Sequence, residues 1–209
     1  MTAVLLTATE ARVLASLVEK SITTPAYYPM TVNGLMAAAN QKSSREPVMS
    51  LSEGEVGNAL LSLEQRGLVA RDDSSARATK WRQKFQHQWL LKPATQAVLV
   101  TLILRGAQTS AELRANAAAL GGPADIDGVQ AALDDLADRA QPLVMTLPRQ
   151  LGQSAVRHAQ LLCGEPDPRT LTTADATPRA AGHAGLDARI SELEQRLSAL
   201  EARLSDLGG

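Results

Sequence analysis

The sequence of 209 residues has few aromatic side chains, one cysteine, no long apolar run and no excess of basic charge. Phe, Trp and Tyr make up 2% of the chain, which excludes a platform that stacks several bases of single-stranded nucleic acid. The single cysteine, Cys163, excludes an internal disulfide and a cysteine-based zinc cluster, and we expect it to be a small buried apolar residue. No stretch has the apolar length of a membrane span, and the start of the chain lacks a basic segment followed by an apolar one. We therefore expect a cytoplasmic protein that has no contact with membranes.

What the chain has in abundance is alanine and leucine, which supply 35 and 31 residues. Because both favour helices, we expect a mainly α-helical α+β protein with a core of small aliphatic side chains. The formal net charge of −1 excludes a uniformly basic protein, but the charge is unevenly distributed. Residues 1–90 carry +2, residues 91–164 carry 0 and residues 165–209 carry −3. Any attraction to a polyanion is therefore expected in the first part of the chain.

Helix starts are marked by capping boxes, in which Ser or Thr is followed three residues later by Glu. The pattern occurs at Thr7–Glu10, Ser52–Glu55 and Thr109–Glu112, each time before apolar residues at helical spacing. Leu68–Arg71 and Thr79–Phe85 instead have the character of strands, the second with clean alternation of apolar and basic residues.

The order of three helices followed by a hairpin occurs twice. In the first copy we expect helices from about residue 8 to 23, 31 to 40 and 52 to 66, followed by the two strands just described. In the second copy the helices are expected at about 93–105, 109–120 and 125–139, with strands at 143–147 and 156–162. This order is that of a winged-helix domain. We therefore predict two tandem winged-helix domains, residues 5–90 and 92–163.

The remainder of the chain is predicted to be a flexible linker, residues 164–185, and a coiled-coil helix, residues 186–207. Apolar residues alternate at spacings of four and three along this last segment: Leu186, Ile190, Leu193, Leu197, Leu200, Leu204 and Leu207. Arg occupies the flanking g positions and acidic residues occupy the e positions, which favours a parallel homodimer. The alternative is a helix that folds back on the domains of its own chain.

Motifs of catalysis are missing from the sequence. It contains no glycine-rich phosphate loop, HExxH, CxxC, GxSxG or SxxK pattern, and its three histidines lie far apart. We therefore expect that the protein is not an enzyme and that it binds no cofactor, metal or small-molecule substrate.

Basic residues of the first hairpin are the strongest candidates for contact with double-stranded DNA. Lys80, Arg82 and Lys84 alternate along the second strand, and we expect Arg71 and Arg77 nearby. Such a row would neutralise phosphates and position the protein without reading base sequence. The alternative is that these cations keep a sheet edge soluble.

The third helix of each domain is less favourable for DNA, although this helix enters the major groove in helix-turn-helix proteins. In the first domain Asn58 can contact base edges, but acidic residues begin the helix. In the second domain the helix is dominated by aspartates, so we expect DNA contact in the first domain alone. The loop before the first domain's third helix adds Lys42 and Arg45, which either contact phosphate or belong to a loop shaped by its Asn, Ser and Pro residues.

Three stretches closely resemble the YceH family of uncharacterised bacterial proteins: Glu19–Asn33, Asn40–Val48 and Leu104–Thr109. The resemblance covers about residues 5–163. It implies a tandem winged-helix fold and no settled activity.

Two functions fit these observations. The first is a dimeric DNA-binding or regulatory protein that uses the hairpin and loop of the first domain. The second is a protein-interaction adaptor without direct DNA binding, in which the winged helices and the tail bind protein partners.

Overall fold

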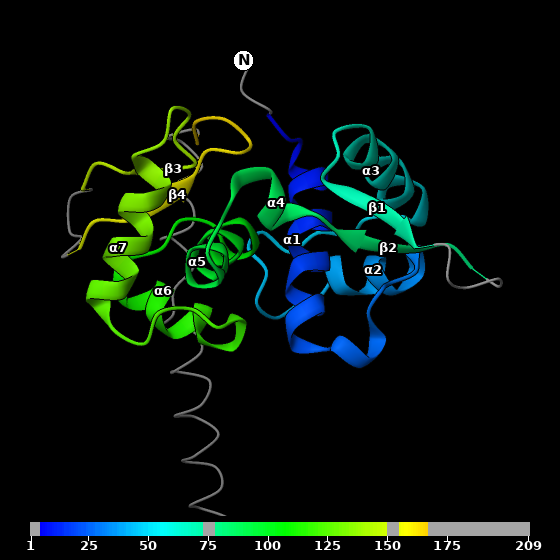
Figure 1. The fold of residues 1–209 in the computed structure, drawn as a ribbon, viewed down its shortest axis with the longest axis horizontal. Helices are drawn as coiled ribbons and strands as arrows, with labels where there is room; N and C mark the ends of the chain where they lie inside the picture. Colours follow the sequence, from blue (N-terminus) through cyan, green and yellow to red (C-terminus); the bar gives the residue numbers. More distant parts are fainter. Residues whose placement is uncertain (1–4, 73–77, 150–154, 167–209) are drawn as a thin grey trace, which may run out of the picture. The chain divides into compact units, whose positions relative to one another are not determined.

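The computed structural model describes residues 5–72, 78–149 and 155–166. Its helices are α1 (Ala8–Thr23), α2 (Val32–Ala39), α3 (Glu53–Gln65), α4 (Phe85–Trp89), α5 (Pro93–Arg105), α6 (Ser110–Ala117) and α7 (Ile126–Ala137), with 3₁₀ turns η1 (Pro25–Tyr27) and η2 (Ala118–Leu120). Strands β1 (Val69–Asp72) and β2 (Lys80–Gln83) form one antiparallel pair, and β3 (Val144–Thr146) and β4 (His158–Gln160) form another (Figure 1). The predicted α+β class with small hairpins is confirmed. Within the described ranges, no helix is long and apolar enough to cross a membrane.

All three predicted capping boxes are present. At the start of α1 the Thr7 hydroxyl accepts a hydrogen bond from the amide of Glu10, and the Glu10 carboxylate accepts one from the amide of Thr7 at 2.7 Å. The same reciprocal bonds join Ser52 to Glu55 and Thr109 to Glu112. Each box satisfies amides that a helix start leaves without partners, so these helices begin where the sequence predicts.

The two halves of the described chain bury the same types of residue at matching positions. The N-cap of α3 is Ser52 and that of α7 is Asp125, and at matching distances from these caps both helices bury Val, Ala, Leu and Leu. These residues are Val56, Ala59, Leu60 and Leu63 in α3, and Val129, Ala132, Leu133 and Leu136 in α7. Helices α1 and α5 likewise share a buried pattern, with Val13, Leu14, Leu17 and Val18 matching Val98, Leu99, Leu102 and Ile103. The repeated order predicted from sequence is therefore present as a repeated core.

Each hairpin is joined to the residue that precedes the N-cap of the second helix in its half. Met30 forms a β-bridge with Trp81 of β2, and Gln108 forms the corresponding bridge with His158 of β4. In the register of the hairpins, Trp81 faces Arg71 and His158 faces Thr146. Trp81 and His158 therefore occupy equivalent positions. Each lies between a bridged residue on one side and the paired strand of its hairpin on the other.

The two halves pack together, and residues up to Pro166 form one compact unit. Helices α1 and α5 contact each other in the middle of this unit, with α3 and α7 toward opposite sides (Figure 1). The amide of Leu6 donates to the carbonyl of Leu162 at 2.7 Å, and the amide of Glu46 donates to the carbonyl of Leu104 at 2.8 Å. Backbone hydrogen bonds thus cross between the halves at both ends of the junction.

Two details differ from the sequence prediction. The strand expected to reach Phe85 ends at Gln83, whose side-chain oxygen accepts the amide of Phe85 at 2.7 Å where α4 begins. Phe85 is still buried, but it belongs to helix α4 and not to the strand. The centre of its ring lies 4.9 Å from that of Trp89 in the same helix. Cys163, expected to be buried, is exposed.

Candidate nucleic-acid interface

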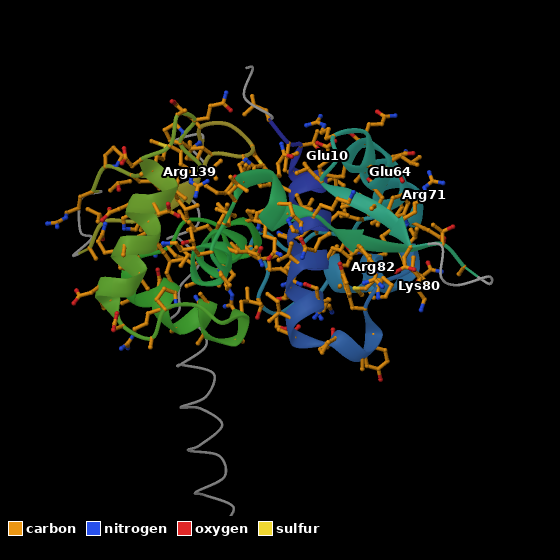
Figure 2. The ribbon with its side chains drawn as sticks, in the orientation of Figure 1. Glu10, Glu64, Arg71, Lys80, Arg82 and Arg139 are labelled. Atoms are coloured by element: carbon orange, nitrogen blue, oxygen red, sulfur yellow. The ribbon has the colours of Figure 1, made fainter. Side chains whose placement is uncertain are left out.

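The first hairpin presents the predicted basic residues, but two of its arginines already have acidic partners. Arg82 forms an ion pair with Asp72 of β1, and its guanidinium lies 5.7 Å from the centre of the Tyr28 ring. Arg71 pairs with Glu64 of α3 at 3.1 Å and lies 5.3 Å from the Trp81 ring (Figure 2). The two arginines therefore brace the hairpin against neighbouring elements, and their charge is largely balanced within the fold.

Lys80 and Lys84 supply the charge that is not balanced in this way. Within the described ranges, neither forms an ion pair with a carboxylate. Lys80 is the first residue of β2, at the end of the hairpin where the loop joins the strands, and lies opposite Asp72 in register (Figure 2). Lys84 is exposed but lies beyond the strand, so it does not extend a straight row with Lys80 and Arg82. Arg77, the remaining predicted hairpin cation, falls outside the described residues.

Tyr28 is a part of this surface that the sequence prediction missed. Its hydroxyl accepts a hydrogen bond from the amide of Gln83 at 2.7 Å, while its ring lies beneath Arg82. Burial raises the pKa of Tyr28, so the phenol stays protonated and neutral. The residue ties the turn after α1 to the end of β2. An aromatic side chain in a short turn carries no sequence signal for that role.

Lys42 and Arg45, predicted together as loop contacts, have opposite environments. Lys42 is exposed, whereas the side chain of Arg45 has 0% relative exposure. Arg45 donates to both carboxylate oxygens of Glu19, at 3.1 and 2.6 Å, and to the carbonyl of Ala38 at the end of α2. Arg45 is therefore enclosed in the fold and is removed from the candidate surface, because its donors are used by Glu19 and by carbonyls that a helix end leaves without partners.

Helix α3 carries Asn58 on its exposed face, as expected for a helix that contacts a ligand. The acidic residues around it are less available than the sequence suggested. The Glu55 carboxylate accepts hydrogen bonds from the hydroxyl and the amide of Ser52, which lower the pKa of Glu55. Glu64 is paired with Arg71. Two of the three glutamates of α3 are therefore directed to partners inside the protein.

Two glycines of the same helix lie on its outward side. A Cβ atom placed on Gly54 or Gly57 would meet no atom within 4 Å. Glycine in a helix costs roughly 0.5–1 kcal/mol relative to alanine, and nothing in the fold requires its small size here. The outward face of α3 thus has two positions without a side chain next to Asn58.

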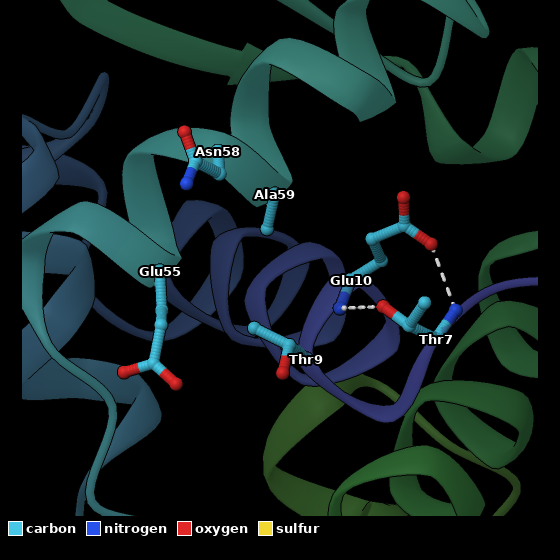
Figure 3. Close-up of a pocket in the computed structure, with 6 residues that line it drawn as sticks. All are labelled: Thr7, Thr9, Glu10, Glu55, Asn58 and Ala59. Atoms are coloured by element: carbon cyan, nitrogen blue, oxygen red, sulfur yellow. Dashed lines mark hydrogen bonds between the residues drawn. The ribbon is translucent and has the colours of Figure 1, made fainter.

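A shallow open hollow of about 270 Å³ lies between the first turn of α1 and the first half of α3 (Figure 3). Its lining consists of Thr7, Thr9, Glu10, Glu55, Asn58 and Ala59. Burial alone would raise the pKa of Glu10, but hydrogen bonds from Ser62 and Thr7 and the charge of Arg66 hold it below its usual value. With two ionised carboxylates, both engaged in capping, this hollow does not suit a phosphate.

The second half presents a different surface. Helix α7 exposes Asp127, Asp134 and Asp135, and its C-cap Asp138 is exposed as well. Arg139 at the end of the helix donates to the carbonyl of Trp89 and pairs with Asp135, so its charge is directed to the protein itself. This acidic surface is unfavourable for contact with phosphates, and the expectation that the second half does not contact DNA stays a prediction.

The predicted dimerisation residues fall outside the described residues. They are the seven apolar positions from Leu186 to Leu207, and the prediction about them rests on the sequence alone.

Comparison with known proteins places the chain in a family. Residues 6–153 match the family described as "Protein of unknown function, DUF480". A UPF0502 protein of Delftia acidovorans is 45% identical over 90% of this chain and 84% of its own length. A UPF0502 protein of Geobacter sulfurreducens is 45% identical over 78% of this chain and 75% of its own length. The UPF0502 protein YceH of Escherichia fergusonii is 43% identical over 90% of this chain and 89% of its own length. The resemblance seen in the sequence is thereby confirmed, and the chain belongs to the DUF480/UPF0502 family, of which YceH is a member.

Proposed function

We propose that this protein is a tandem winged-helix DNA-binding regulator whose first half, residues 5–90, contacts duplex DNA. Three helices followed by a hairpin, with Met30 bridged to Trp81 beside that hairpin, support a winged helix in this half. The same order and the bridge between Gln108 and His158 support a second winged helix. The outward face of α3 is the observation that carries DNA contact.

The outward face of α3 is open to a ligand and carries a side chain that can contact bases. Gly54 and Gly57 leave the helix backbone open, so a groove wall can approach closely. Asn58, directly after Gly57, has the amide donor and acceptor that pair with an adenine edge in the major groove. The backbone of α3 would then lie in the groove with its carboxylates turned toward Ser52 and Arg71.

The hairpin supplies the complementary charge. Lys80 and Lys84 are the cations that would neutralise phosphates flanking the groove, and such contacts position a protein without reading sequence. Arg71 and Arg82 hold the hairpin in place through Glu64 and Asp72. A contact made through two lysines is modest, so tight binding requires more than one copy of the first half on the DNA.

The substitution Gly57→Gln tests this arrangement. Glutamine favours helix, and a Cβ atom at this position meets no atom within 4 Å, so the variant should be at least as stable as the wild type. Its side chain would occupy the space of the DNA, and duplex affinity at low salt should fall at least about tenfold. The position of α7 that matches Gly57 is already Gln130, so Ala131→Gln, at the exposed position that matches Asn58, is the control and should bind normally. Absence of any duplex binding by the wild type, or full binding by the Gly57 variant, contradicts the proposal.

We also propose, from the heptad spacing alone, that residues 186–207 pair two copies in parallel. The two DNA-contacting halves would then bind as a dimer. Removing the chain after Gly185 should halve the mass measured by light scattering. An unchanged mass contradicts the dimer and favours the alternative in which the segment packs on its own chain.

A second candidate function is a protein-interaction adaptor, favoured by the acidic outward face of α7. Asp127, Asp134 and Asp138 would suit a basic protein surface and exclude nucleic acid. Purification from cells with and without nuclease separates the two functions. Partners that persist after nuclease treatment, with no retained nucleic acid, favour the adaptor.

A further inference from the structure

The loop after α2 meets the end of α5 at a cluster of cations drawn from both halves. Arg105, at the last turn of α5, donates from Nη2 to the hydroxyl of Ser44 at 2.7 Å. Lys42 lies in the same loop two residues before Ser44, and it is exposed. Lys20, in the last turn of α1, reaches the side chain of Gln41 at 3.4 Å. Three elements thus bring cations to residues 41–44.

The carboxylates near this loop do not balance that charge. Glu19 is held by both nitrogens of the Arg45 fork and is also 3.4 Å from Lys20. Glu46 is exposed, and its charge acts on the guanidinium of Arg12. Across the described residues, neither Lys42 nor Arg105 forms an ion pair. Two positive charges are therefore left over where the halves meet.

Backbone donors are available at the same place. The amides of Lys42, Ser43 and Ser44 make no hydrogen bond to any part of the chain that the structure describes. Ser44 has a φ of 60°, in the left-handed region that non-glycine residues rarely adopt. Consecutive amides beside a left-handed residue are the kind of backbone that forms concave anion sites.

The environment of Arg105 also favours a bound anion. Burial lowers the pKa of its guanidinium, the charge of Glu19 opposes that shift, and the neighbouring Arg45 adds to it. An arginine stays charged even so, and a bound anion would offset both the burial and the repulsion between the two guanidinium groups.

We propose that residues 41–44, with Lys42 and Arg105, bind a phosphate group at the junction of the two halves. Lys42 and the loop amides come from the first half and Arg105 from the second, so a bound phosphate would hold the halves together. The site is separate from α3 and the hairpin, and it does not depend on DNA binding by those elements. The phosphate belongs either to a free small molecule or to a DNA backbone, and the chemistry of recognition is the same.

Thermal unfolding and titration calorimetry of the full chain test the site, with inorganic phosphate and pyrophosphate as probes and chloride at matched ionic strength as reference. We expect saturable stabilisation by the phosphate probes. A bond from a charged donor to phosphate is worth enough that Lys42→Gln and Arg105→Gln should each weaken binding about tenfold. Lys92→Gln and Arg114→Gln, exposed residues of equal charge, are controls and should bind as the wild type does.

A second arm measures duplex DNA binding by the same variants. If Lys42→Gln and Arg105→Gln weaken DNA binding and the free probes do not bind, the phosphate is that of DNA. If the free probes bind and these substitutions leave DNA affinity unchanged, the ligand is a free phosphate compound. Failure of the wild type to bind DNA contradicts the proposed function but leaves the free-phosphate arm intact.

The proposal is overturned if Lys42→Gln matches the wild type in both arms. Lys42 is exposed and forms no ion pair within the described ranges, so this variant is expected to fold even if Arg105→Gln loosens the junction. The proposal is equally overturned if phosphate acts no differently from chloride and both substitutions leave DNA binding unchanged.

Discussion

Helices α3 and α7 have the same buried face and different outward faces. Each buries Val, Ala, Leu and Leu at matching positions after its N-cap. Outward, α3 has Gly54, Gly57, Asn58, Leu61 and Gln65 where α7 has Asp127, Gln130, Ala131, Asp134 and Asp138. Packing needs are equal in the two halves, so the buried residues agree. The outward residues are not constrained by packing, and in the proposed function their difference corresponds to different partners for the two halves.

The two small sheets also differ, in the side chain that anchors each hairpin to the rest of its half. In the first, Trp81 is buried beneath Arg71 and bridged to Met30. In the second, His158 takes that place, with its ring nitrogens 3.2 Å from the Thr146 hydroxyl and 3.4 Å from the Ser110 hydroxyl. One hairpin is thus anchored by apolar area and the other by a polar network.

The largest effect is expected from Trp81→Ala. Removing a buried indole costs about 3–5 kcal/mol in unfolding free energy, because the cavity cannot fully collapse. His158→Ala should cost less, about 1–3 kcal/mol, since it removes a smaller ring and leaves two hydroxyls without their partner. Urea unfolding measures both. Equal losses would contradict the contrast between an apolar and a polar anchor.

The loop after α2 provides a second contrast, between Arg45 and Lys42. Arg45→Ala leaves Glu19 without its main partner and the end of α2 without a donor, and should cost about 3 kcal/mol. Lys42→Ala should change the unfolding free energy by less than about 0.5 kcal/mol, because its side chain is exposed. Chemical unfolding of the two variants distinguishes them. A small effect at Arg45 would show that the loop does not depend on this ion pair.

Glycines on the two matched helices should respond in opposite directions. Gly57→Ala should stabilise the protein by about 0.5–1 kcal/mol, since the new methyl group meets no atom within 4 Å. Gly128→Ala in α7 should destabilise it, because a Cβ there would lie 2.9 Å from the Pro123 Cβ. The melting temperatures report both signs. Stabilisation by both changes would mean that α7 has room that the structure does not show.

A smaller effect is expected from pH at His158. Burial lowers its pKa below the ordinary 6.5, and Asp134 partly opposes the shift. The folded state therefore prefers the neutral ring. The stability from this preference is complete above about pH 6.5 and is lost as pH falls through the lower pKa of the folded state. The unfolding free energy should thus decrease between pH 7.5 and pH 5.5, and less so in His158→Gln. The same pH dependence in both proteins would exclude His158 as its source.

Local signals in the sequence predicted much of the fold. The Thr and Ser caps located three helix starts, and the spacing of apolar residues gave the buried faces of α1, α3, α5 and α7. Helix α4 was missed because Trp81 and Phe85 fit an alternating strand, and the cap by Gln83 has no distinctive pattern.

The candidate site was harder to predict, because charge partners depend on tertiary contacts. Arg45 and Glu19 are 26 positions apart in the chain, and Arg71 meets Glu64 only after β1 folds against α3. Sequence reasoning identified the cations but not which of them would be balanced.

The salt dependence of duplex binding tests the central claim most directly, namely that α3 and the hairpin of the first half contact DNA and that the outward face of α7 does not. Binding constants of the wild type, Lys80→Gln/Lys84→Gln and Lys92→Gln/Arg114→Gln would be measured over a range of salt concentrations. If both hairpin lysines contact phosphates, their loss should reduce the slope of log K against log salt by about 1.8, whereas the second-half variant keeps the wild-type slope. Equal slopes for the two variants, or no duplex binding by the wild type at low salt, would contradict the account.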